Sequence, residues 1–256
     1  MTTLRIEPQG PIAILRLDKP RGNAIDEPLL DDLEQACRIL TKDNGFRGVL
    51  LASSHAKVFC PGLDLVTLVE YDRPTLKRFM LRFAQAIWSL YALPKPVVAA
   101  VSGHALAGGC ILALTADHRI LRSGAQIGLN EVRLGVPLPW SVSVLLRASL
   151  APEAFARVAL LGNNLSGQEA LAAGLVHELA DADGFEAACL ARLDEFAARD
   201  PRALATTKAY LRAAALREMK EREEELITEF LDGWFSETTR ARIRETALSL
   251  QKARGA

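Results

Sequence analysis

One acidic residue, Glu131, has different surroundings from the other acidic residues of the chain. Most Asp and Glu residues fall on polar faces of predicted helices, where water solvates them, whereas Glu131 closely follows the apolar Ile127-Gly128-Leu129. An apolar environment raises the proton affinity of a carboxyl group, which suits a general base or a general acid. The alternative is a structural glutamate that forms an ion pair with Arg133 or Arg119. The pattern leaves both interpretations open.

The stretch of residues 102–114 contains glycines that a ligand could approach closely. It follows the apolar run of residues 96–101, which is long enough for one buried strand, and Gly108 falls where a buried helix should begin. A helix start offers unpaired N–H groups and the positive end of the helix dipole. The N–H of Gly108 is therefore a candidate donor to developing negative charge, with tight packing as the alternative reason for Gly108-Gly109. These glycines match neither a G-x-G-x-x-G fingerprint nor a P-loop.

Composition limits the class of protein. With 256 residues, 50% of them hydrophobic and 24% charged, the chain suits one large domain or one domain with a helical appendage. Its 31 basic and 31 acidic residues cancel, so no nucleic-acid partner is expected. The four cysteines are far apart, which predicts reduced thiols and no metal site. No apolar run could span a membrane and the first residues lack signal-peptide features, so we expect a cytoplasmic protein without a membrane partner.

Alternating strands and helices would position the candidate residues. Asp26 can cap a helix that has Pro28 in its first turn. In chain order, we expect a hairpin over residues 4–17, a helix from Asp26 to residue 40, a strand over 48–52, a helix over 72–91, a strand over 96–101, a helix from 108 and a strand over 118–121. Residues 125–137 should be mostly loop, followed by helices over 142–146, 155–161 and 166–173. This alternation indicates an α/β fold. From residue 185 onwards the chain should be helical, with breaks near Asp200-Pro201 and Gly233.

Three local predictions concern polar residues. Asp64 is a candidate cap for the helix that follows the Pro61-Gly62 turn. Ser166 and Glu169 have the spacing of a capping box. The charged run of residues 220–225 is expected to form a solvated helix face.

Four motifs, taken in order, resemble a known family. They are Phe59-Cys60-Pro61-Gly62-Leu63-Asp64-Leu65, residues 95–103, Ala107-Gly108-Gly109-Cys110 and Gly128-Leu129-Asn130-Glu131. In this order they resemble the crotonase (enoyl-CoA hydratase/isomerase) superfamily. Asn23-Ala24, residues 166–170 and residues 174–176 fit the same pattern, so the resemblance extends over nearly the whole chain.

The resemblance implies a fold and an assembly. The expected fold is α/β, with a spiral core of repeated ββα units over residues 1–195 and a C-terminal helical trimerisation region over residues 196–256. The expected assembly is a homotrimer or a dimer of trimers. The substrates would be acyl-CoA thioesters, with coenzyme A as part of the substrate, no separate cofactor and no metal. A place in fatty acid β-oxidation is expected.

The resemblance also implies roles for individual residues. The N–H groups of Leu63 and Gly108 match the family's oxyanion hole, which binds the thioester oxygen more strongly as an enolate forms. Pro61 stands where the family usually has a small residue. The positions that match CoA- and substrate-binding segments are Ala24, Pro61, Gly62, Asp64, Leu65 and Asn130. Candidates for an apolar acyl pocket are Ile111, Leu134 and Trp140, with Leu106 and Leu138, and for each of them core packing is the alternative.

Two positions decide which reaction is expected. Hydratases of this family hold water between two glutamates, one of which matches Glu131, whereas the other position is occupied by Ile111. A single base can instead take a proton from C2 of a 3-enoyl-CoA and return it to C4. This is the reaction of Δ3,Δ2-enoyl-CoA isomerases, whose motifs are the most similar to this chain. We therefore predict an isomerase with Glu131 as its proton shuttle; the alternatives are an enoyl-CoA hydratase, another thioester enolate enzyme, or a non-catalytic acyl-CoA binder.

Overall fold

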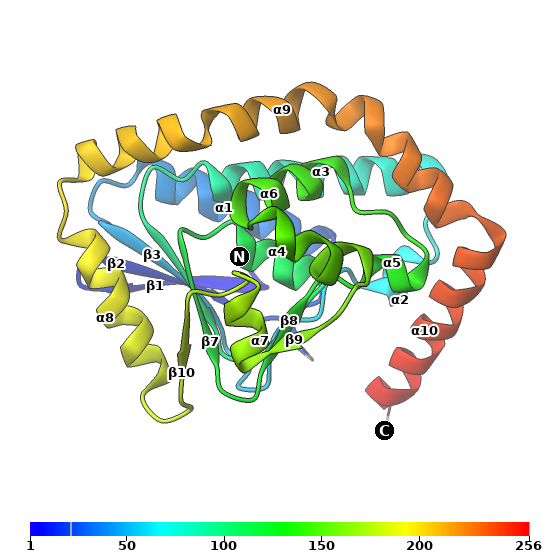
Figure 1. The fold of residues 1–256 in the computed structure, drawn as a ribbon, viewed down its shortest axis with the longest axis horizontal. Coiled ribbons are helices and arrows are strands. Elements are labelled where there is room, and N and C mark those ends of the chain that lie inside the picture. The colour runs from blue at the N-terminus through cyan, green and yellow to red at the C-terminus, as the bar shows by residue number, and fades with distance from the viewer. Residues whose placement is uncertain (21, 256) are drawn as a thin grey trace.

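Two sheets form the centre of the computed structural model, which describes residues 1–20 and 22–255 (Figure 1). The larger sheet has the strand order β1-β2-β3-β5-β7-β10. Only the hairpin pair β1–β2 is antiparallel in it. Its strands are β1 (Leu4–Gln9), β2 (Ile12–Leu17), β3 (Gly48–Ser53), β5 (Val97–Val101), β7 (His118–Arg122) and β10 (Glu178–Ala180).

The smaller sheet shows the repeated strand–strand–helix unit of the fold. It has the order β4-β6-β8-β9 and consists of β4 (Val58–Cys60), β6 (His104–Leu106), β8 (Gln126–Gly128) and β9 (Leu165–Ser166). From β3 to β8, successive strands alternate between the larger and the smaller sheet. Each repeat therefore adds one strand to each sheet before a helix follows, which confirms the ββα core that the family resemblance implies.

Helices cover the sheets and end the chain. They are α1 (Glu27–Lys42), α2 (Leu65–Leu68), α3 (Arg73–Tyr91), α4 (Gly108–Leu114), α5 (Glu131–Leu134), α6 (Trp140–Ser149), α7 (Gly167–Ala172), α8 (Phe185–Ala197), α9 (Pro201–Phe235) and α10 (Glu237–Gly255), with a 3-10 turn at Pro152–Ala154 and a π turn at Ala156–Leu160. As predicted, Asp26 caps α1 by accepting a hydrogen bond from the Leu29 N–H. No helix among the described residues is both long and apolar enough to cross a membrane.

The core lies on both faces of the larger sheet. On one face the sheet packs against α1 and α3, and on the other Leu50, Val98 and Ile120 contact Phe185 and Leu193 of α8. Because β3 and β5 are buried on both faces, their sequences are continuous apolar runs. This is why those two strands could be predicted from sequence.

A buried ionic cluster fastens α9 to the core. The Asp117 carboxylate accepts hydrogen bonds from Lys208 Nζ and Arg212 Nη2, both at 2.6 Å, and from the Val97 N–H at 2.7 Å. Lys208 also donates to the Lys95 carbonyl at 2.7 Å. We refer to Asp117, Lys208 and Arg212 as the Asp117 cluster. It sets the position of the helix that crosses the top of the molecule in Figure 1.

Several sequence-based predictions about local structure need correction. Residues 125–137, predicted as mostly loop, contain β8 and the single turn α5. The break predicted near Gly233 falls at Ser236, and α9 runs through Gly233, whose missing Cβ would lie 2.6 Å from Pro137 Cδ. Ser166 makes no side-chain cap, and Glu169 pairs with Arg157 instead of closing a capping box.

The charged run of residues 220–225 differs from expectation at one position. Glu223 is only 1% exposed, while the other residues of the run are exposed. Its carboxylate accepts hydrogen bonds from the Ser141 N–H at 2.7 Å and the Ser141 hydroxyl at 2.5 Å. Burial raises the pKa of Glu223. This side chain therefore joins α9 to the first turn of α6 instead of meeting water.

Candidate active site

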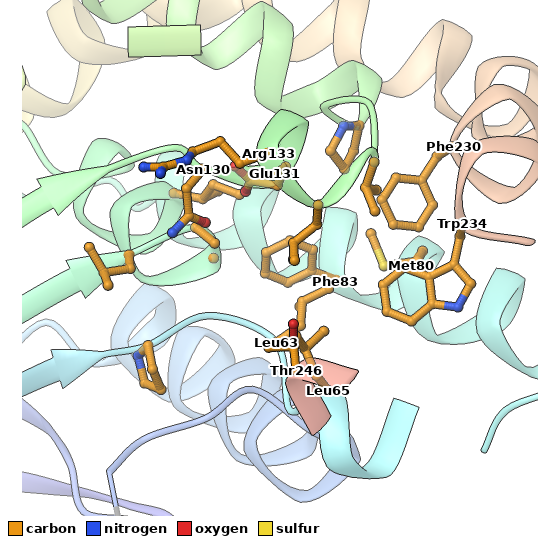
Figure 2. Close-up of a pocket in the computed structure, with 18 of the residues that line it drawn as sticks. Leu63, Leu65, Met80, Phe83, Asn130, Glu131, Arg133, Phe230, Trp234 and Thr246 are labelled. Carbon is orange, nitrogen blue, oxygen red and sulfur yellow. The ribbon is translucent and has the colours of Figure 1, made fainter. Parts of the chain in front are cut away.

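A largely apolar cavity of about 620 Å³ lies where α3, α4, α5, α9 and α10 meet. Glu131 and Asn130 lie toward one end of it, and Met80, Phe230 and Trp234 toward the other (Figure 2). Among the described residues that line it, Glu131 is the one carboxylate. The lining consists of Val58, Pro61, Leu63, Leu65, Met80, Phe83, Leu106, Ala107, Gly108, Ile111, Asn130, Glu131, Arg133, Leu134, Val136, Pro139, Phe230, Trp234, Thr246 and Leu250.

One oxygen of the Glu131 carboxyl group lacks a hydrogen-bond partner among the described residues. Glu131 begins α5, and this oxygen, Oε2, is buried. Neither arginine considered from the sequence pairs with it: Arg119 donates to the carbonyls of Leu175, Gly174 and Ala116, and Arg133 is exposed. Burial raises the pKa of Glu131 to about 7. A carboxyl group in this condition can accept a proton and return it near neutral pH.

Two unpaired backbone N–H groups lie beside the cavity. Leu63 is held in a parallel bridge with Ile25, in which the Ile25 N–H donates to the Gly62 carbonyl at 2.8 Å and the Asp64 N–H to the Ile25 carbonyl at 2.9 Å. This bridge uses the neighbours of the Leu63 N–H and leaves that N–H without an acceptor among the described residues. The N–H of Gly108, the first residue of α4, likewise has no acceptor in the part of the chain that the structure describes.

Strain and close packing bring these two N–H groups together. Gly62 has φ +103°, and a Cβ on it would lie 3.1 Å from Gly108 N, so the two loops touch. Ala107 has φ +47° and ψ −119°, a conformation that side-chain-bearing residues rarely adopt, and its N–H donates to the Gly128 carbonyl at 2.8 Å. Gly109 admits no side chain, because a Cβ there would lie 2.0 Å from the Cys60 carbonyl oxygen.

The residues expected to bind substrate divide into two groups. Pro61, Leu65 and Asn130 line the cavity, whereas Ala24, Gly62 and Asp64 are not part of its lining. Lys19 connects two of the latter: its Nζ donates to the Ala24 carbonyl at 2.8 Å and lies 3.8 Å from Asp64 Oδ2. The Asp64 side chain makes no cap at α2, so that prediction is wrong. Ala24 and Asp64 thus support the loop that carries Leu63.

The acyl-pocket candidates are only partly brought together. Leu106, Ile111 and Leu134 line the cavity. Trp140 does not, because its ring lies 5.6 Å from the Arg147 guanidinium and 4.9 Å from that of Arg222, and its Nε1 donates to the Glu218 carbonyl. Leu138 also lies outside the lining.

Sequence reasoning missed most of the apolar end of the cavity. The missed side chains come from α3, α9 and α10, and they are Met80, Phe83, Phe230, Trp234, Thr246 and Leu250. The apolar periodicity of residues 72–91 does identify Met80 and Phe83 as buried. However, periodicity cannot separate a side chain that faces a cavity from one that faces the core.

The chain is similar in sequence to known acyl-CoA enzymes. A family model described as enoyl-CoA hydratase/isomerase matches residues 7–245. Human mitochondrial enoyl-CoA delta isomerase 1 is 31% identical over 206 residues, which cover 79% of this chain and 68% of that protein. The carnitinyl-CoA dehydratase of Proteus mirabilis is 30% identical over 214 residues, which cover 83% of this chain and 81% of that protein.

Solved structures with a similar fold also belong to enoyl-CoA isomerases and hydratases. The crystal structure of human mitochondrial delta3-delta2-enoyl-CoA isomerase matches with a TM-score of 0.94 at 25% identity, covering 98% of this chain and 99% of that chain. An enoyl-CoA hydratase from Mycobacterium marinum matches with a TM-score of 0.81 at 27% identity, covering 89% of this chain and 99% of that chain. The similar proteins therefore include both isomerases and hydratases.

Proposed function

The chain belongs to the enoyl-CoA hydratase/isomerase family, and from this premise we propose that it is an isomerase that moves the double bond of a 3-enoyl-CoA to the 2-position. The observation that carries the proposal is Glu131, which is the single carboxylate among the described residues that line a largely apolar cavity and forms no ion pair within the described part of the chain. A hydratase of this family would need a second carboxylate to hold water. The position for it is Ile111, which lines the same cavity.

Glu131 would act as the proton shuttle. Its carboxylate accepts a proton from C2, and the electrons of the C2–H bond move into the thioester carbonyl to give a dienolate. The Glu131 carboxyl group then donates the same proton to C4, and the electrons of the dienolate form the C2=C3 double bond. Reactant and product have the same atoms and charge, so the reaction needs no cofactor beyond the coenzyme A of the substrate.

The N–H groups of Leu63 and Gly108 would bind the thioester oxygen. Both lie at the cavity, and neither has an acceptor among the described residues. Donors that are fixed before the reaction stabilise the developing enolate without reorganisation, and the loss of one such donor typically costs about 2.7–4 kcal/mol. The strained Ala107 and the tightly packed Gly109 would hold the second donor in place.

Hydration of a 2-enoyl-CoA is the competing activity, because hydratases and a dehydratase are among the similar proteins. The test is to incubate the purified protein with 3-hexenoyl-CoA and, separately, with 2-hexenoyl-CoA, and to identify the products. We expect conversion of the 3-enoyl substrate to 2-hexenoyl-CoA. Predominant formation of the 3-hydroxyacyl product from 2-hexenoyl-CoA would replace isomerase by hydratase, and binding without turnover would indicate an acyl-CoA binder.

Replacement of the base tests its assigned role. Glu131→Gln keeps the size of the side chain but removes the proton acceptor, so the kcat of isomerisation should fall about 10²- to 10⁴-fold. In the wild type, kcat/KM should rise with pH up to about 7 and then level off, because only the ionised carboxyl group can accept the C2 proton. Glu224→Gln, on an exposed part of α9, is the matched control. Full activity in Glu131→Gln would remove Glu131 from the mechanism.

We also propose a homotrimer in which the C-terminal helices take part. Large apolar side chains of α9 and the π turn are exposed in the single chain: Tyr210 at 78%, Leu211 at 80% and Leu160 at 74%. Such side chains, when they gather, are typical of interfaces. Light scattering on the purified protein would give the mass of the assembly, and a monomer would contradict this proposal.

A further inference from the structure

The helix that begins with Glu131 is too short to hold its own position. α5 is a single turn of four residues, and Asn130 at its start makes no side-chain cap. Isolated helices of this length are not stable in water, since each turn must be fixed before hydrogen bonds compensate for the lost entropy. Contacts from other elements must therefore fix the direction of the Glu131 side chain.

One such contact comes from Thr239, in the first turn of α10. Thr239 is only 3% exposed, and its hydroxyl donates to the Gly135 carbonyl at 3.1 Å. Gly135 ends α5 with φ +88°, and a Cβ on it would lie 2.7 Å from Thr239 Oγ1. The next N–H in the chain, that of Val136, donates to the Glu131 carbonyl at 3.1 Å. A short chain of contacts thus joins Thr239 to the backbone of Glu131.

The same helix also reaches the other side of the cavity. α10 packs against α5 and against α2, the turn that follows the Leu63 loop (Figure 1). Its Thr246 and Leu250 line the cavity between those two turns. α10 is therefore placed where one element can fix the distance between the base and the oxyanion loop.

The charged groups around α5 do not fix the position of Glu131 by an ion pair. Arg133 on α5 is exposed, and Arg242 on α10 lies against Gly135, but neither forms an ion pair with Glu131 in the described part of the chain. The Cys110 thiol of α4 faces the same region, and burial followed by the Glu131 charge raises its pKa, so it stays neutral. Among the described residues, the side-chain hydrogen bond that reaches the end of α5 is that of the Thr239 hydroxyl to the Gly135 carbonyl.

We propose that Thr239 is a positioning residue, which holds α5 through the Gly135 carbonyl so that Glu131 faces the substrate. This inference rests on the proposed function, in which Glu131 is the base. If Thr239 only contributed to the packing of α10, its hydroxyl would affect stability and leave the chemistry of Glu131 unchanged.

The test compares Thr239→Val, which keeps the shape but loses the hydroxyl, with Thr239→Ser, which keeps the hydroxyl. Thr238→Val, at the exposed neighbouring position, is the matched control. For Thr239→Val we expect kcat about tenfold lower with KM within about twofold, in line with the loss of one hydrogen bond. The midpoint of its kcat/KM profile should fall below 7, because a mobile α5 lets water reach the carboxyl group. Thr239→Ser and Thr238→Val should match the wild type.

A second measurement keeps the inference testable without turnover. Hydrogen–deuterium exchange of residues 131–136 should be faster in Thr239→Val, and in Thr239→Ala if the valine variant folds poorly, than in Thr238→Val. Unchanged exchange in α5, an unchanged pH midpoint, or an equal loss of kcat in Thr239→Ser would overturn the positioning role. A wild-type protein without isomerase activity would instead refute the proposed function, and the exchange result would still decide whether Thr239 holds α5.

Discussion

At the scale of single residues, Glu131 has a buried carboxyl oxygen, Oε2, without a hydrogen-bond partner among the described residues. Natural buried carboxylates usually accept hydrogen bonds or pair with a cation, because a charge taken out of water is costly. The Oε2 of Glu131 has no such partner among the described residues, and its pKa is raised to about 7. A group with this pKa reduces the stability of the fold at neutral pH, which is the usual condition of residues that serve chemistry.

The cost of that charge predicts how stability depends on pH. The pKa of Glu131 is about 7 in the folded protein and 4.5 for an ordinary glutamate, so the folded state binds the proton more tightly. Stability should therefore fall as pH rises from 4.5 to 7, and above 7 the full cost of about 3 kcal/mol is present. Glu131→Gln should be more stable than the wild type at pH 8, and the difference should shrink towards pH 5. Urea unfolding at both pH values measures this, and a difference independent of pH would contradict it.

At the scale of elements, the turn before α4 stores strain. Ala107 adopts φ +47°, which brings its Cβ close to the backbone, and Gly108 follows it directly. Such a conformation costs about 1–3 kcal/mol and persists only where the surroundings enforce it. Here the enforcing contacts are the Ala107 N–H bond to Gly128 and the contact with Gly62.

This strain gives a prediction with an unusual sign. Ala107→Gly should stabilise the fold by about 1 kcal/mol, because relief of the strained conformation exceeds the added entropy of the unfolded chain. Ala214→Gly, on the exposed face of α9, should instead destabilise it by about 1 kcal/mol. Thermal unfolding of both variants checks the pair of signs. A lower Tm for Ala107→Gly would show that the backbone there is relaxed.

The length of an element decides whether its type can be predicted from the sequence. The helix over residues 73–91 repeats its apolar pattern over several turns, and β3 and β5 are continuous apolar runs, so their type was evident. β8 and α5 have three and four residues, too few for a period to appear. Gly233 looked like a break, but its lack of a side chain serves the contact with Pro137 within α9.

The residues of the candidate site also differ in whether the sequence alone could identify them. Glu131, Leu63 and Gly108 could be identified because each lies in or beside a local motif. The apolar end of the cavity could not, because Met80, Phe230 and Trp234 come from distant helices that only the fold brings together. Glu223 shows the same limit, since nothing in a charged run marks one glutamate as the partner of Ser141.

At the scale of the whole molecule, the Asp117 cluster determines where α9 lies. Lys208 and Arg212 are buried, and both depend on the Asp117 carboxylate for charge compensation. The opposite end of the same helix supplies Phe230 and Trp234 to the cavity. The attachment of α9 to the core therefore contributes to the shape of the site.

Removal of the Asp117 charge should destabilise the whole fold. Asp117→Asn leaves two buried cations without a counter-charge, and breaking such a pair typically costs about 3–5 kcal/mol. Asp232→Asn removes the partner of Arg73 from an exposed pair and should cost less than about 1 kcal/mol. Chemical denaturation of the two variants tests the difference. A similar small effect in both would mean that α9 is held by apolar packing alone.

Glu131 shares its cavity with side chains of α9 and α10, so protonation of Glu131 and binding of an acyl chain in that cavity are linked. An acyl chain that fills the cavity replaces water with hydrocarbon beside the carboxyl group, which favours its neutral form further. Near pH 7, an unreactive acyl-CoA should therefore bind with uptake of part of a proton, and calorimetry in buffers of different ionisation enthalpy would detect it as a buffer-dependent heat. Since linked equilibria are reciprocal, a fall in pH should tighten binding by the same coupling. Such a protein would hold its acyl ligands most firmly under the conditions in which its base is least able to react.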